Sequence, residues 1–199
     1  MNVKKEILEA HRILETIRDK VISNVDERFS ATFKIKNLPN HDGFDVDANT
    51  HKDSRYIFTQ LDKIECDCLY WFSLETKEQA KELNSLLNKY RKKNKKGSKG
   101  FRCVPATSKN EDSEVLYVGI RRGGITIKSR LTNITGRVNQ HLGYYHKGST
   151  QGLQLIHFAK ECDFDITINV VKIESSCSMY LNIIEKLVAK KLKPLCGRH

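Results

Sequence analysis

The stretch Asp165-Ile-Thr-Ile-Asn-Val-Val-Lys-Ile173 is the clearest strand in the chain, because β-branched residues dominate it. Two more strands are predicted upstream. The first is the apolar run Cys66–Leu74, and the second is Glu114–Ile120, which the run Arg121-Arg-Gly-Gly124 closes. Helices are predicted between and after these strands. Together the elements predict an α+β domain, with a small three-stranded antiparallel sheet flanked by helices.

The predicted helices cover residues 76–90, 129–143 and 150–161, and a last helix begins at Ser176 or Ser178. Thr76-Lys-Glu-Gln79 is typical of a helix start, with a hydroxyl that can cap the first turn. The last helix is rich in lysine and ends near Pro194. We therefore expect one domain over residues 61–199, with a helical and basic insert at 75–113.

Residues 1–60 are predicted to form a separate N-terminal extension. Its first helix, over residues 3–21, carries apolar residues at alternating spacings of four and three: Val3, Ile7, Ala10, Leu14, Ile17 and Val21. Three heptads are short for a free coiled coil, so this helix is expected to dock on the body or to pair in a homodimer. Residues 31–36 alternate like a strand, and the rest of the extension is irregular.

The composition is that of a globular protein of 199 residues, 39% hydrophobic and 30% charged, with a net charge of +11. This charge favours a polyanionic partner, with nucleic acid first and an anionic membrane second. No run approaches the roughly 18 apolar residues of a membrane helix, and the start lacks the apolar block of a signal peptide. A cytoplasmic protein is expected.

Basic residues are concentrated between Lys89 and Arg102, where eight Lys or Arg occur without an acidic residue. Such a block is either a flexible solvated loop or an arm that grips a phosphate backbone, and we favour the arm. The residues predicted to contact nucleic acid are Lys92, Lys93, Lys95, Lys96, Lys99, Arg102, Arg121 and Arg122.

Five residues could together carry phosphodiester chemistry: Tyr70, Tyr117, Arg137, His141 and Glu185. Hydrolysis needs an activated water, charge neutralisation in the transition state and help for the leaving oxygen, which a carboxylate-held metal and an arginine can supply. Arg137 and His141 are four residues apart on one predicted helix, so both can face one cleft. Taken singly, each residue has an ordinary structural explanation, such as a helix-surface ion pair for Glu185.

Together these residues resemble the motifs of the GIY-YIG nuclease superfamily, over about two thirds of the chain. Cys68-Leu-Tyr70 stands where the family has Gly-Ile-Tyr, and Tyr117-Val-Gly119 stands for Tyr-Ile-Gly. Arg137-Val-Asn-Gln-His141 resembles the following helix, and Ile184-Glu185 the helix with the metal-binding glutamate. The first glycine is replaced by Cys68, and 47 residues separate Tyr70 from Tyr117. This long insert is similar to those of elaborated, restriction-type members.

The resemblance implies a DNA endonuclease that depends on Mg²⁺ or Mn²⁺. Tyr117 or Tyr70 would orient or deprotonate the attacking water, and Arg137 would hold the scissile phosphate. His141 would assist the hydroxyl network or act as the base, and Glu185 would bind the metal. Arg130 competes with Arg137 as the phosphate clamp. A restriction-type or stand-alone enzyme is expected. The alternative is a non-catalytic nucleic-acid-binding protein on a degenerate nuclease scaffold.

Overall fold

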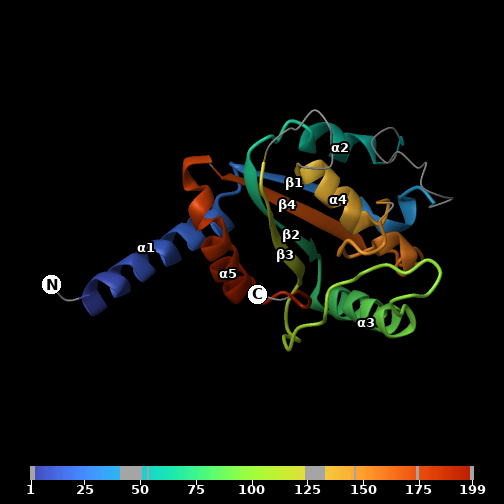
Figure 1. The fold of residues 1–199 in the computed structure, drawn as a ribbon. Coiled ribbons are helices and arrows are strands. Elements are labelled where there is room, and N and C mark those ends of the chain that lie inside the picture. Colours follow the sequence, from blue (N-terminus) through green and yellow to red (C-terminus); the bar gives the residue numbers. More distant parts are fainter. Residues whose placement is uncertain are drawn as a thin grey trace.

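The computed structural model describes residues 3–40, 51–52, 54–123, 133–145, 147–173 and 175–197. At its centre is an antiparallel sheet in the order β1-β4-β2-β3, with helices on both faces (Figure 1). The strands are β1 (Arg28–Lys34), β2 (Asp67–Leu74), β3 (Val115–Arg121) and β4 (Asp165–Ile173). The predicted α+β class is confirmed. The predicted number of three strands is wrong, because β1 adds a fourth.

Strand β1 comes from the region predicted to be a separate extension. It pairs along its whole length with β4, from Arg28 opposite Val171 to Lys34 opposite Asp165. The alternating pattern at 31–36 indicated a strand, but nothing local named its partner. Residues on both sides of the expected boundary at residue 60 therefore contribute strands to the same sheet.

The helices are α1 (Val3–Ser23), α2 (Arg55–Leu61), α3 (Lys77–Lys93), α4 (Ile134–Leu142) and α5 (Leu181–Leu192). The start predicted for α3 is confirmed, since Thr76 accepts a hydrogen bond from the Gln79 amide. Helix α2 was not predicted. None of the described helices has the length and hydropathy needed to cross a membrane.

The helix predicted over residues 150–161 is wrong. This segment contains only a single 3-10 turn, η3 (Leu155–His157), preceded by Gln154 in the left-handed region at φ 61°. A left-handed non-glycine residue interrupts the helical path, so the apolar residues here pack as a loop. The last helix also begins later than predicted, at Leu181, after the 3-10 segment η4 (Ser175–Tyr180).

Alternation along β2 divides the core between the two faces of the sheet. Tyr70 and Phe72 face the larger cluster, which includes residues of α2, α3 and α4. Leu69 and Trp71 face the smaller cluster, which α5 covers. Helix α1 packs against α5 with its C-terminal half and projects away from the sheet with the other half (Figure 1).

Candidate active site

Tyr70 and Tyr117 lie on neighbouring strands and face the same side of the sheet. In the β2–β3 register Tyr70 is opposite Gly119, and Tyr117 is opposite Phe72. The two tyrosine rings stack with centroids 6.3 Å apart. This packing requires a glycine at position 119, because a Cβ there would lie 2.6 Å from the Tyr70 hydroxyl and 2.8 Å from the Tyr117 ring. Gly119 therefore provides the space into which the Tyr70 ring extends.

Helix α4 places Arg137 and His141 against these tyrosines. The helix is capped by Asn133, which accepts from the Gly136 amide, and it ends at Gly143 with φ 111°. Arg137 Nε donates to the Tyr70 hydroxyl at 2.9 Å, and His141 Nε2 lies 3.0 Å from the same oxygen. The structure thus brings together four of the five residues selected from the sequence.

The guanidinium of Arg137 is held in place on several sides. One amino group donates to Gln140 Oε1 at 2.9 Å and to the Gln151 carbonyl at 2.6 Å, and the other donates to the Tyr117 hydroxyl at 3.4 Å. All of these acceptors are neutral. Among the described residues no carboxylate lies within ion-pair distance of Arg137, so its positive charge stays available to an anion.

The hydrogen bonds of His141 determine which ring nitrogen carries the proton. The Leu153 amide donates to Nδ1 at 3.1 Å, so Nδ1 is unprotonated. Burial, and next the charge of Arg137, hold the pKa of His141 well below its usual value, so the ring is neutral. Nε2 therefore carries the hydrogen and donates to Tyr70. With no free lone pair, His141 acts as a hydrogen-bond donor in this geometry, and a role as the base is disfavoured.

The loop at residues 151–153 lies close against α4, and this contact makes the arrangement possible. At Gly152 a Cβ would lie 2.5 Å from the Gln140 carbonyl, so only glycine allows the loop to lie against α4. The flanking residues then supply the two backbone groups that contact the site, the Gln151 carbonyl and the Leu153 amide.

The two tyrosines differ in their access to solvent. Tyr70 is fully buried, whereas Tyr117 is 9% exposed. Burial is the main cause that raises the pKa of each hydroxyl, and the nearby charge of Arg137 opposes it. Both are therefore protonated in the free protein at neutral pH. Tyr117 is therefore the more accessible of the two to solvent.

Glu185 and Arg121 complete the charged environment. Glu185 lies half-buried on α5, and burial raises its pKa against the opposing charges of Lys186 and Arg137. Its negative charge also opposes ionisation of Tyr117, so Glu185 is within electrostatic reach of that hydroxyl. Arg121, at the end of β3, has a pKa lowered by burial and next by the like charge of Arg137. Both guanidiniums are partly buried and repel each other, so an anion that reached both would be stabilised.

The residues present restrict how a metal could be held. Within the described ranges, no three His, Cys, Asp or Glu side chains gather as a ligand set. Mg²⁺ keeps several waters and commonly binds one or two carboxylates together with substrate phosphate oxygens. Glu185, half-buried and within electrostatic reach of Arg137, fits the role of a single protein ligand of this kind.

The basic segment, defined as Lys89–Arg102, is only partly available for phosphate contacts. Lys92, Lys93, Lys95, Lys96 and Lys99 are exposed, as is Arg122. Arg102 is not exposed: its side chain donates to the Tyr145 carbonyl, and Asn94 bonds both its backbone groups. This position argues against the predicted contact of Arg102 with nucleic acid, because the residue anchors the segment to the body. Arg130, the competing clamp, lies outside the described residues.

Some contributors to the site were not selected from the sequence. Gln140 is buried and accepts from Arg137 three positions earlier on α4, a spacing that could have indicated it. The loop groups at Gln151 and Leu153 are backbone atoms, for which no side-chain signal exists.

Comparison with known proteins yields no relative of this chain. No protein-family model matches it, and neither a curated protein nor a solved structure does. The resemblance to GIY-YIG nucleases therefore stays a prediction from the sequence motifs.

Proposed function

We propose that this protein is a divalent-metal-dependent DNA endonuclease of the GIY-YIG type, of the restriction or stand-alone class. The observation that carries the proposal is the position of Arg137, which bonds both tyrosine hydroxyls and is within electrostatic reach of Glu185. These are the residue types that phosphodiester hydrolysis needs, in one partly buried site.

The phosphate would bind between Arg137 and Arg121. Negative charge grows on the phosphoryl oxygens as the bond breaks, and fixed guanidiniums in a partly buried site stabilise that charge without reorganising. Arg137 is already oriented by Gln140 and the Gln151 carbonyl, so little ordering is needed when the phosphate arrives. Binding would also relieve the repulsion between the two arginines.

Tyr117 would contact the attacking water. It is the more exposed of the two tyrosines, and its hydroxyl is linked to Arg137. Tyr70 accepts hydrogen bonds from Arg137 and His141, and we assign it to positioning these two side chains. A metal held by Glu185 would add positive charge beside the attacking water and the leaving oxygen. That charge would lower the cost of removing a proton at Tyr117.

The exposed lysines of the basic segment would bind the DNA backbone away from the site of cleavage. Lys92, Lys93, Lys95 and Lys96 are solvent-exposed at the end of α3 and in the following turn. Contacts of this kind are independent of base sequence.

The test is incubation of supercoiled plasmid with the purified protein and Mg²⁺, with an EDTA control, beside Glu185→Gln. We expect nicked or linear DNA only with the metal and the intact carboxylate. The matched control is Glu82→Gln, an exposed glutamate on α3, which should cleave normally. Normal cleavage by folded Glu185→Gln would refute the proposed metal site.

The second candidate is a nucleic-acid-binding protein without catalysis. The exposed lysines favour it, because their contacts need none of the residues around Arg137. It predicts salt-sensitive retardation of the DNA with no cleavage at any metal concentration, on a DNA library that covers varied sequences.

A further inference from the structure

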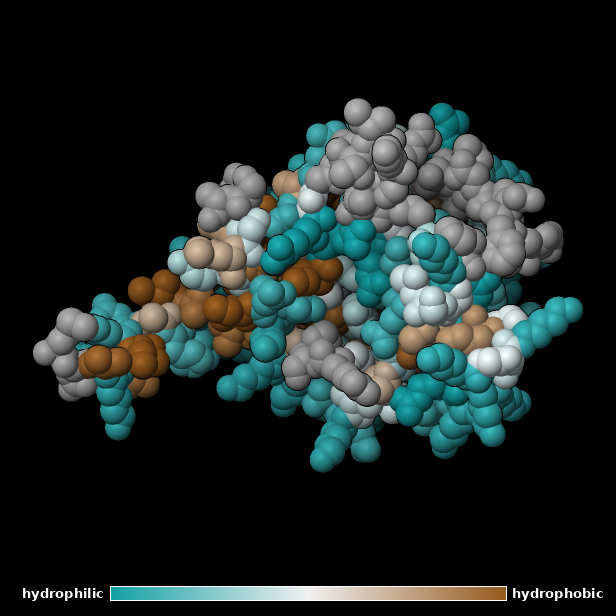
Figure 2. Space-filling model, viewed as in Figure 1, coloured by the Kyte–Doolittle hydropathy of each residue, from teal (hydrophilic) through white to brown (hydrophobic). Residues whose placement is uncertain are grey.

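An apolar surface lies on α1 and the adjoining part of η4 and α5. Of the ten exposed large hydrophobic side chains in the described residues, seven lie here: Val3, Ile7, Ile13, Ile17, Met179, Tyr180 and Ile183. Leu8 is also exposed, on another side of α1. Figure 2 shows this hydrophobic surface on the projecting helix and beside the body. Concentrated exposure of this kind marks an interaction site.

The surface is hollowed where α1 meets the body. A groove of about 410 Å³ runs between Ile13 and Ile17 of α1 on one side and Tyr180 and Ile184 on the other. The N-terminal half of α1 continues the apolar seam beyond the groove, with Val3 56% and Ile7 63% exposed. Helix α1 therefore has an apolar N-terminal half that projects from the body, and its C-terminal half forms one wall of an apolar groove.

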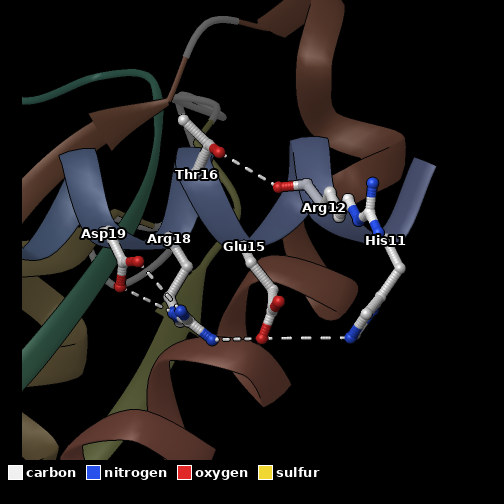
Figure 3. A network of polar contacts seen from close by, with 6 residues as sticks. All are labelled: His11, Arg12, Glu15, Thr16, Arg18 and Asp19. Carbon is white, nitrogen blue, oxygen red and sulfur yellow. Dashed lines mark hydrogen bonds and ion pairs between the residues drawn. The ribbon is translucent and has the colours of Figure 1, made fainter. Parts of the chain in front are cut away.

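The charges of α1 argue against an anionic membrane or nucleic acid as the partner. Five basic and four acidic residues occupy Val3–Ser23, so the helix has almost no net charge. Charged side chains of its polar side also pair with one another, since Arg18 contacts both Glu15 and Asp19 (Figure 3). Helices that lie on anionic membranes instead carry a polar face rich in Lys and Arg.

We propose that this surface binds a second copy of the chain, with the two α1 helices packed antiparallel. In this arrangement Ile7 lies against Ile17 of the partner subunit, and each projecting half-helix enters the other copy's groove. The small Ala10 lies near the crossing point, where the helices approach closely. The pairing is isologous, as expected for a twofold dimer.

The flanking charges fit this orientation. Along one side of the seam, Glu6 of one helix falls next to Lys20 of the partner subunit, with Ile13, which lines the groove, near the twofold axis. Neither Glu6 nor Lys20 has an ion-pair partner among the described residues. The largest apolar patch on a typical monomer measures roughly 300–600 Å², which approaches the about 800 Å² that each partner contributes to a standard interface.

Sedimentation velocity of the full chain tests the proposal without reference to nuclease activity. We expect twice the chain mass at micromolar concentration, and a shift to the single mass in Ile7→Glu. The matched control is Leu8→Glu, whose position is about 100° further around the helix and off the seam. It should keep the double mass, and circular dichroism should show both variants folded.

Charge reversal tests the orientation. Glu6→Lys and Lys20→Glu should each weaken the dimer roughly two- to fivefold, as exposed ion pairs do, and the double variant should restore it. A wild-type protein that stays monomeric overturns the proposal, whether or not it binds anionic vesicles. Equal dissociation by Leu8→Glu and Ile7→Glu also overturns it.

Discussion

The residues around Arg137 and the basic segment are both cationic regions, yet they are built in opposite ways. Arg137 is surrounded by hydrogen-bond acceptors, with Tyr70 and His141 fully buried beside it. The lysines at 92–99 are exposed, and within the described residues no ion pair involves them. The first region has fixed geometry, whereas the second has charge without fixed geometry.

In the proposed nuclease, this contrast would separate two tasks. Stabilising a transition state requires groups placed before the substrate arrives, which burial and packing provide. Attracting a polyanion requires only net positive charge, which mobile side chains supply at lower structural cost. Changes in the first region should therefore alter cleavage, and changes in the second should alter binding.

The largest effect is expected for Arg137→Lys. Lysine keeps the charge but lacks the planar fork that reaches Tyr70, Tyr117, Gln140 and Gln151 together. We expect a loss of about 10²–10³ in the single-turnover cleavage rate, with DNA affinity nearly unchanged. Arg55→Lys, at an exposed arginine on α2, is the matched control and should cleave normally. A parallel fall in affinity would show that Arg137 acts in binding rather than in chemistry.

A smaller effect is expected when Lys92, Lys93, Lys95 and Lys96 are all changed to Gln. For every phosphate that the protein no longer neutralises, the slope of log affinity against log salt should become shallower by about 0.9. We expect weaker binding to every DNA sequence, while the cleavage rate at saturating protein is preserved. Filter binding across a salt series gives the slope. An unchanged slope would mean that these lysines are solvent-exposed but do not contact the DNA.

The smallest effect compares one glycine from each region. Gly119→Ala places a methyl group 2.6 Å from the Tyr70 hydroxyl and should lower the free energy of unfolding by about 1–3 kcal/mol. Gly97→Ala, in the basic segment, meets no atom within 4 Å but sits at φ 94°, so it should cost about 1–2 kcal/mol from backbone strain alone. Urea denaturation measures both. Only Gly119→Ala should also slow cleavage, and equal cleavage by the two variants would contradict the proposed role of the tyrosine pair.

The sequence by itself determined the elements whose signals are local. Strand β4 has the bounds that its β-branched run predicts, and α3 begins after the Thr76 cap. The pairing of Arg137 with His141 on one helix face also follows from their spacing. In each case the deciding residues lie within one or two turns of one another, so the local pattern was sufficient.

Only the tertiary structure decided the features that depend on distant segments. The pairing of β1 with β4, the stacking of two tyrosines 47 residues apart and the anchoring of Arg102 all join chain segments with no common local pattern. The protonation of His141 was also decided there, by one backbone amide in a loop that the sequence predicted to be a helix. The register of paired strands and the position of a loop against a helix are set by packing across the whole core. A contact made by a backbone group also does not depend on which side chain that residue carries, so the sequence gives no local indication of it.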